Sequence, residues 1–142
     1  MTEQLSPLAL QALAVVEESG AIINANHAHP HTIRHKGRID LVTETDIAVE
    51  AFLKERLATL APQAGFLAEE SAEDLSLPDT CWIIDPVDGT TNFAHGLPLT
   101  VTSVAYRLNG EIVLGIVNAP LLRECFIAEK GKGRSEEHTS EL

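Results

Sequence analysis

One run of residues is more informative about the fold than any other part of the chain. It reads Trp82-Ile83-Ile84-Asp85-Pro86-Val87-Asp88-Gly89-Thr90-Thr91. Its apolar start predicts a short buried strand, and Pro86, which has no backbone N–H to donate, predicts that this strand stops where Asp85 begins. Gly89 allows a tight turn, and a helix that opens at Thr90 would point its amides and the positive end of its dipole at an anion. The run therefore predicts a site for a metal ion and a phosphate at the end of a strand.

The composition limits the class of protein. The 142 residues are 44% hydrophobic, which is enough for one globular domain with its own core. The net charge of -11 argues against nucleic acid and against a membrane as partner, since both select basic surfaces, and it suits a divalent cation. We find no signal-peptide pattern and no apolar run near the roughly 20 residues of a membrane-spanning helix. We therefore expect a cytoplasmic protein, with Cys81 and Cys125 as buried thiols.

One helix is expected near the start of the chain, over residues 8–19. Ser6 and Pro7 are typical of a helix cap and a first helical residue, and Gly20 is expected to end or loosen the helix. The histidine-rich tract over residues 24–35 is interpreted as an exposed connection and not as a metal site. Pro30 interrupts this tract, and no cysteine or acid lies among its histidines.

A second amphipathic helix is expected over residues 47–60, where apolar residues recur at helical spacing. Thr43 or Thr45 is a reasonable cap for this helix. Asp46 then falls in the first turn, where a carboxylate is favourable against the helix dipole. On this pattern alone, Asp46 is equally well explained as a capping residue and as a functional one.

The strands are expected to form a mainly antiparallel sheet. Residues 66–68 predict a short buried strand that ends at Glu69. Asn109-Gly110 is typical of a two-residue hairpin turn, here between strands over 101–107 and 111–117, and a third strand is expected over 123–129. The order of helix, helix, strand, strand and antiparallel meander predicts the α+β class, with helices layered beside the sheet.

Three carboxylates are candidates for one metal site. Glu69, Asp85 and Asp88 are expected to converge from two strand ends, and they would repel one another unless cations neutralised them. Hard oxygen ligands select Mg²⁺ or Mn²⁺. Because Mg²⁺ keeps several of its waters, it can hold a nucleophilic water and also bridge to a substrate phosphate. This combination suits the hydrolysis of phosphate esters.

These residues resemble the inositol monophosphatase family of metal-dependent, lithium-sensitive phosphatases. Three blocks carry the resemblance in order: Asp40–Asp46, Leu67–Ser71 and Trp82–Phe93. The third block is long and unusual enough to be strong evidence alone. The family's usual glycine before the paired glutamates is Ala68 here. The resemblance covers about residues 8–133 and matches the N-terminal half of the family, which implies an incomplete layered α/β sandwich of the sugar phosphatase type.

The resemblance implies roles for individual residues. The metal ligands would be the side chains of Glu69, Asp85 and Asp88 and the carbonyl of Val87. Asp46 and Thr90 would orient a metal-activated water, with Asp46 accepting the hydroxyl proton of Thr90, so the catalytic set is Asp46, Thr90 and Glu69. The amides of Gly89 and Thr90, beside Asp88, would hold the substrate phosphate.

The implied activity is Mg²⁺-dependent hydrolysis of a phosphate monoester, with inositol monophosphate as substrate. Related enzymes that act on fructose bisphosphate or a bisphosphorylated nucleotide stay open, as does an inactive binding module. The resemblance also implies a homodimer of the complete protein.

The two ends of the chain carry different expectations. Residues 1–133 are expected to be the N-terminal portion of an inositol monophosphatase-like domain. Residues 134–142 show no apolar periodicity and match one reading frame of a common sequencing adaptor. We therefore expect them to be a non-native tail that does not continue the meander, and we expect a chain without its second half to expose strand edges and to fold poorly or bind metal weakly.

Overall fold

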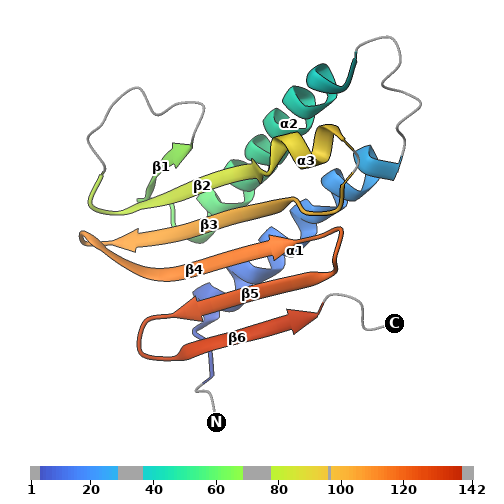
Figure 1. Cartoon of the computed structure of the whole chain (residues 1–142). Coiled ribbons are helices and arrows are strands. Elements are labelled where there is room, and N and C mark those ends of the chain that lie inside the picture. Colours follow the sequence, from blue (N-terminus) through green and yellow to red (C-terminus); the bar gives the residue numbers. More distant parts are fainter. Residues whose placement is uncertain (1–3, 29–36, 69–77, 96, 139–142) are drawn as a thin grey trace.

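The computed structural model describes residues 4–28, 37–68, 78–95 and 97–138, and it forms helices beside a six-stranded sheet (Figure 1). The elements follow the order α1 (Pro7–Ala28), α2 (Gly37–Leu60), β1 (Gly65–Ala68), β2 (Cys81–Asp88), α3 (Thr90–Ala94), β3 (Val101–Leu108), β4 (Glu111–Ala119), β5 (Glu124–Glu129) and β6 (Gly133–His138).

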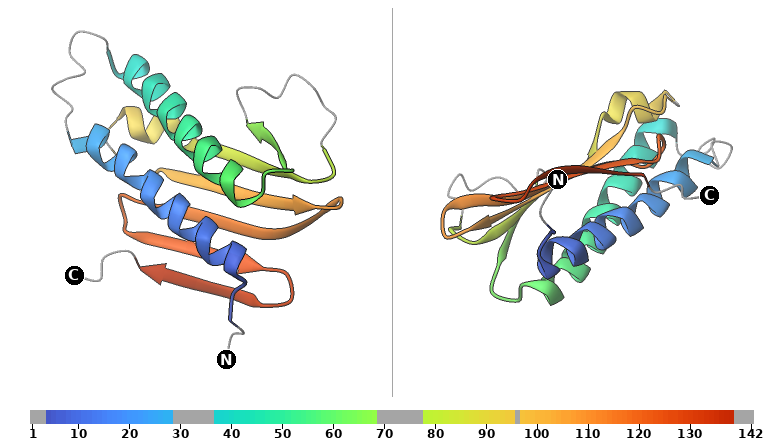
Figure 2. Two further views of the ribbon diagram at one scale, coloured as in Figure 1. Left: turned by 180° about the vertical axis from the view of Figure 1, so that it is seen from behind. Right: turned by 90° about the horizontal axis from the view of Figure 1, so that it is seen from below.

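The sheet follows the order of the chain, from β1 at one edge to β6 at the other. β1 and β2 are parallel, and each later strand is antiparallel to the one before it. α1 and α2 lie against the same face of the sheet, as the views from behind and from below show (Figure 2). The predicted α+β class and the mainly antiparallel sheet are confirmed.

The core lies between the two long helices and the sheet. Its fully buried side chains include Val16 and Ile23 from α1, and Leu53 from α2. They pack against Trp82 and other buried residues of the strands, and the rings of Trp82 and Tyr106 lie 4.4 Å apart. Cys81 and Cys125 are both buried, as predicted.

α1 begins as predicted but continues past the expected end. The Ser6 hydroxyl accepts a hydrogen bond from the Ala9 amide at 3.1 Å, so Ser6 caps the helix. Gly20 does not end the helix: a Cβ placed there would lie 2.8 Å from Cβ of Pro120. The glycine therefore serves a close approach between α1 and the end of β4, and the helix runs on through His27.

The extended α1 changes two further expectations. The first residues of the tract over 24–35 are helical and not a connection, whereas His29, His31 and His35 lie outside the described residues. By length and composition, Pro7–His27 is a helix that could cross a membrane, contrary to the expectation that no segment qualifies. The core helix of a soluble protein passes the same test, and α1 buries one side against the sheet.

α2 begins at Gly37, well before the expected residue 47. Thr43, Thr45 and Asp46 therefore lie inside the helix and do not cap it. Thr45 is fully buried, and its hydroxyl accepts a hydrogen bond from Nδ2 of Asn26 at 2.7 Å. This bond joins α1 to α2. The threonine at position 45 therefore serves a contact between two helices and not the helix cap that the pattern predicted.

β2 does not stop at Asp85, because a β-bulge accommodates Pro86. Asp85 pairs with Ser103 and Asp88 pairs with Val101, so β2 has one residue more than β3 between these pairs. A residue that cannot donate to the ladder is tolerated at such a bulge. The Pro86 carbonyl accepts a hydrogen bond from the Thr102 hydroxyl at 2.8 Å, which ties the bulge to β3.

The hairpin between β3 and β4 is confirmed. Leu108 pairs with Glu111, and the two residues between them, Asn109 and Gly110, have φ values of 52° and 85°. A two-residue type I′ turn has positive φ at both of its central residues, and its twist matches that of the two flanking strands.

The end of the chain departs from expectation, because residues 134–138 do continue the meander as part of β6. Gly131, with a φ of 80°, returns the chain after β5. Ladder hydrogen bonds use the backbone, so an extended segment can pair with an open edge without any apolar pattern. The non-native origin of residues 134–142 stays a prediction.

We predict that Gly20→Val lowers the free energy of unfolding by about 2 kcal/mol, because the added atoms overpack the contact with Pro120. Gly115→Val is the matched control, since a Cβ at Gly115 meets no atom within 4 Å. Urea unfolding measures both. Equal stability of the Gly20 variant and wild type would contradict the packing role of Gly20.

We predict that the folded state loses stability as the pH rises above about 9. Burial raises the pKa of the Cys81 thiol from its ordinary 9.0, against a lowering by Arg107, and burial raises the pKa of the Tyr106 hydroxyl from 10.0. Folding therefore favours the neutral forms, and this stabilisation is lost once the unfolded groups ionise. Unfolding free energies between pH 7 and 11 measure the decline. Cys81→Ala and Tyr106→Phe should each make it shallower, and slopes identical to wild type would refute the assignment.

Candidate active site

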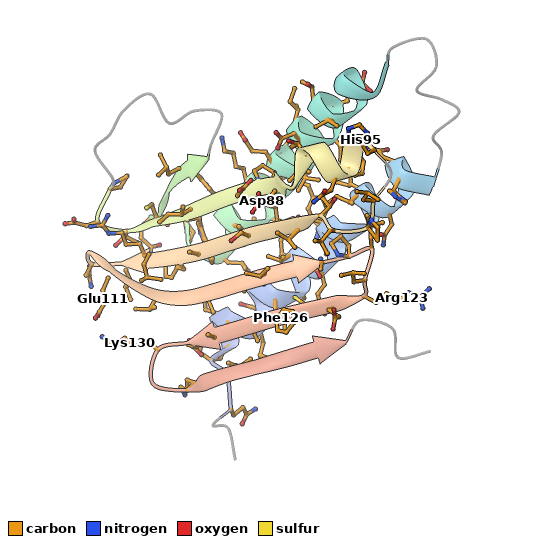
Figure 3. The ribbon with its side chains drawn as sticks, in the orientation of Figure 1. Asp88, His95, Glu111, Arg123, Phe126 and Lys130 are labelled. Atoms are coloured by element: carbon orange, nitrogen blue, oxygen red, sulfur yellow. The ribbon has the colours of Figure 1, made fainter. Side chains whose placement is uncertain are left out.

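The end of β2 holds two of the predicted metal-binding carboxylates. Asp85 and Asp88 pair with Ser103 and Val101, which lie two residues apart on β3 and therefore share a face of the sheet. The buried residues of β3, Thr102, Val104 and Tyr106, face α1 and α2. The two aspartates consequently lie on the face that points away from these helices, and Figure 3 shows Asp88 near the end of β2.

The β-bulge also leaves two residues of β2 without a paired residue on β3. Pro86 and Val87 fall between the two paired positions of β2 and have no partner residue on β3. The Val87 side chain is 2% exposed and belongs to the core. The carbonyl predicted to be a metal ligand thus belongs to a residue that is fixed by packing but lies outside the β2–β3 pairing.

Only glycine fits at position 89, because a side chain there would collide with a neighbouring backbone atom and because the backbone has a positive φ. Its φ is 88°, and a Cβ there would lie 2.7 Å from the carbonyl oxygen of Leu99. Its own carbonyl accepts a hydrogen bond from the Phe93 amide at 3.0 Å, and α3 begins at Thr90, as predicted. The amides after Gly89 are therefore held at a turn that only glycine fits.

Asn92 fixes this turn, although sequence reasoning gave it no role. Its Nδ2 donates a hydrogen bond to the Leu99 carbonyl at 2.9 Å. Its carbonyl accepts from the amides of His95, at 3.2 Å, and Leu97, at 2.8 Å. The carbonyl that packs against Gly89 is thus held by Asn92. Sequence reasoning could have found Asn92, because this residue lies within the Trp82–Phe93 block that carries the family resemblance.

Asp46 lies on α2, a helix that contacts both β2 and α3. The Oδ1 atoms of Asp46 and Asp85 are both shielded from solvent. The end of α1 adds a further contact, because the His27 and Phe93 rings lie 6.1 Å apart. Helix packing therefore places the helix of Asp46 beside the turn that begins at Gly89.

Glu69, the third predicted metal ligand, lies outside the described residues. Within residues 4–28, 37–68, 78–95 and 97–138, no three histidine, cysteine or acidic side chains form a group that could hold a metal ion. The described donors are Asp85, Asp88 and the Val87 carbonyl, which are hard oxygen ligands on neighbouring residues of one strand end. Their chemistry fits a divalent cation such as Mg²⁺.

The fold is that of a class of phosphatases. Inositol monophosphatase-II from Staphylococcus aureus has this fold, with a TM-score of 0.81 and 27% identity over 96% of this chain and 50% of that chain. A model of the inositol monophosphatase family matches residues 4–140. The chain belongs to the inositol monophosphatase family, whose members are phosphatases that generally depend on metal ions.

Two curated relatives show how much of the family this chain represents. It is 44% identical to an inositol monophosphatase of Dictyostelium discoideum over 126 residues, which are 86% of this chain and 46% of the relative. It is also 44% identical over 94 residues to a fructose-1,6-bisphosphatase/inositol-1-monophosphatase of Thermotoga maritima, covering 66% of this chain and 36% of the relative. The chain spans about half the length of the curated relatives it matches, or less.

We predict that Gly89→Ala destabilises the fold more than Gly131→Ala does. Both glycines have positive φ, 88° and 80°, so both variants carry the cost of about 1 kcal/mol of a left-handed alanine. Only the Gly89 variant also brings a Cβ to 2.7 Å from a backbone oxygen, whereas a Cβ at Gly131 meets nothing within 4 Å. We expect a difference of at least about 1 kcal/mol by urea unfolding. No difference would mean that the contact with Leu99 does not constrain the turn.

Proposed function

We propose that the complete protein hydrolyses a phosphate monoester in a Mg²⁺-dependent reaction, and that inositol monophosphate is the substrate. The observation that carries this proposal is the end of β2, where a bulge sets Asp85 and Asp88 on one face immediately before a turn that requires Gly89. The family and the names of the relatives support the same reaction class.

The cation would be held by the carboxylates of Asp85 and Asp88, the carbonyl of Val87 and, as the resemblance implies, Glu69. When bound, Mg²⁺ lowers the pKa of a coordinated water and neutralises charge on the phosphate. The protein's contribution is to hold these oxygens in place. Burial of the Val87 side chain and the hydrogen bond from Thr102 to Pro86 support such a fixed strand end.

The amides of Gly89 and Thr90 would bind the phosphate oxygens. Their direction is supported by the positive φ of Gly89 and by the start of α3 at Thr90. Asp46 would accept a hydrogen bond from the Thr90 hydroxyl, and the oriented hydroxyl would in turn hold the attacking water. The contact between α2 and α3 supports this pairing.

We expect Asp88→Asn in the complete protein to lower kcat/KM for inositol 1-phosphate about a hundredfold or more, because the cation loses an anionic ligand. Phosphate release at varied Mg²⁺ concentration measures the effect, and higher Mg²⁺ should recover part of the activity. Asp79→Asn, at an exposed position before β2, is the control and should leave turnover unchanged. An Asp88 variant with the Mg²⁺ dependence of wild type would sink the assignment.

The runner-up substrates are fructose bisphosphate and a bisphosphorylated nucleotide, and the printed name of the Thermotoga maritima relative includes the first of these activities. Relative kcat/KM values across a panel of the three phosphate esters separate them. A binding module without catalysis is a different alternative, and calorimetry with Mg²⁺ distinguishes it, because such a module has no need of paired metal sites. We infer lithium sensitivity and a homodimer of the complete protein from the family resemblance, and we infer a cytoplasmic location from the sequence pattern.

A further inference from the structure

The turn at Gly89 separates two residues that the proposed function uses in different roles. Asp88, the last residue of β2, is the predicted metal ligand, and Thr90, the first residue of α3, is predicted to hold the attacking water. The backbone conformation at Gly89 therefore sets where the Thr90 hydroxyl lies relative to the carboxylate of Asp88. Glycine is the least restricted residue, so contacts from outside the turn must fix this conformation.

These contacts converge on Asn92. Apart from its chain neighbours, the three atoms nearest to a Cβ built at Gly89 are the Leu99 carbonyl oxygen at 2.7 Å, Nδ2 of Asn92 at 3.4 Å and Cα of Thr100 at 3.6 Å. Nδ2 of Asn92 also donates the hydrogen bond of 2.9 Å to the same Leu99 carbonyl. One side chain therefore lies beside the turn and holds the neighbouring backbone against it.

The backbone of Asn92 restrains the same segment. Its carbonyl accepts hydrogen bonds from the amides of His95, at 3.2 Å, and Leu97, at 2.8 Å. The side chains of Leu97 and Leu99 are 51% and 61% exposed, so their burial contributes little to the position of residues 97–99. The hydrogen bonds of Asn92 supply this restraint instead.

The two predicted carboxylate ligands are held by different contacts. Asp85 and Asp88 pair with residues of β3 on either side of the bulge. The bulge is itself tied to β3, because the Thr102 hydroxyl donates a hydrogen bond to the Pro86 carbonyl at 2.8 Å. None of these contacts involves Asn92, so loss of its side chain loosens the turn and leaves the pairing of the two aspartates intact.

We propose that Asn92 is a positioning residue for the reaction. Its side chain, through the Leu99 carbonyl, sets the position of the Thr90 hydroxyl relative to the metal ligands. The inference rests on the proposed function, which assigns the attacking water to Thr90. Turnover then depends on the turn that Asn92 holds, whereas Mg²⁺ affinity depends on the pairing of β2 with β3. A general loss of stability would lower both quantities together.

The first test is kinetic and uses the complete protein. Asn92→Ala removes the hydrogen bond to Leu99 and introduces no charge near the cation. We expect kcat for inositol 1-phosphate to fall about tenfold or more, because a small displacement of the group that holds the water is sufficient for such a loss. We expect the Kd for Mg²⁺ alone, measured by calorimetry, to change less than about threefold, because the carboxylate ligands keep their places.

Two variants of the complete protein are the controls. Asn24→Ala replaces an exposed asparagine of α1 and should leave both kcat and the Kd for Mg²⁺ unchanged. Gly20→Val is the control for stability, because it overpacks the contact of α1 with Pro120. At a temperature where this variant is fully folded, its kcat should equal that of wild type.

The second test observes the turn without turnover and uses this chain. Hydrogen exchange detected by NMR follows the Phe93 amide, which donates to the Gly89 carbonyl at 3.0 Å. In Asn92→Ala this amide should exchange about fivefold faster or more, although alanine is the better helix former. The Lys130 amide, which donates to the Val113 carbonyl at 2.9 Å, should exchange at the wild-type rate.

A wild-type kcat in Asn92→Ala, or a wild-type exchange rate at Phe93, overturns the inference. An equal loss of kcat and Mg²⁺ affinity also overturns it, because the whole site is then disturbed. A comparable loss of kcat in Gly20→Val does so too, because stability alone then explains the effect. A complete wild-type protein with no Mg²⁺-dependent turnover overturns the proposed function itself, whereas the exchange rate at Phe93 tests the contact of Asn92 alone.

Discussion

Burial of a single face of the sheet is the constraint on which the rest of this structure depends. Trp82, Val104 and Ile116 come from neighbouring strands and are at most 1% exposed beneath α1 and α2. Register follows from this burial, because a slip by one residue would move these side chains to the other face. The helix positions follow too. Gly20 and the hydrogen bond from Asn26 to Thr45 set how closely α1 approaches the sheet and α2.

The candidate site is a local consequence of that register. The bulge at Pro86 lets β2 continue past a residue that cannot donate to the ladder, and it brings Asp88 onto the face of Asp85. The chain then turns at Gly89, against a carbonyl that Asn92 holds. Two carboxylates and the first amides of α3 therefore lie at one strand end, where Gly89 alone of the described residues has a positive φ.

Local patterns predicted most of the elements because they report local energetics. The Asn109-Gly110 turn, the cap at Ser6 and the helix start at Thr90 each depend on a few neighbouring residues, and all are confirmed. The wrong predictions have tertiary causes. Gly20 is a site of close packing and not a helix end, and Thr45 is satisfied by Asn26 and not by a cap. Residues 134–138 pair with β5 through backbone groups that carry no side-chain pattern.

The properties of the candidate site also separate into those that the sequence predicted and those that depend on tertiary structure. The sequence by itself determined the family, through motifs such as Trp82–Phe93, and it predicted Asp85 and Asp88 as the carboxylate ligands. It also predicted the turn at Gly89, because that turn depends on local backbone conformation. Only the tertiary structure decided that the two aspartates share the face opposite the helices and that Asn92 supports the turn. These properties depend on register and on which face α1 and α2 cover, and contacts between residues distant in the chain determine both.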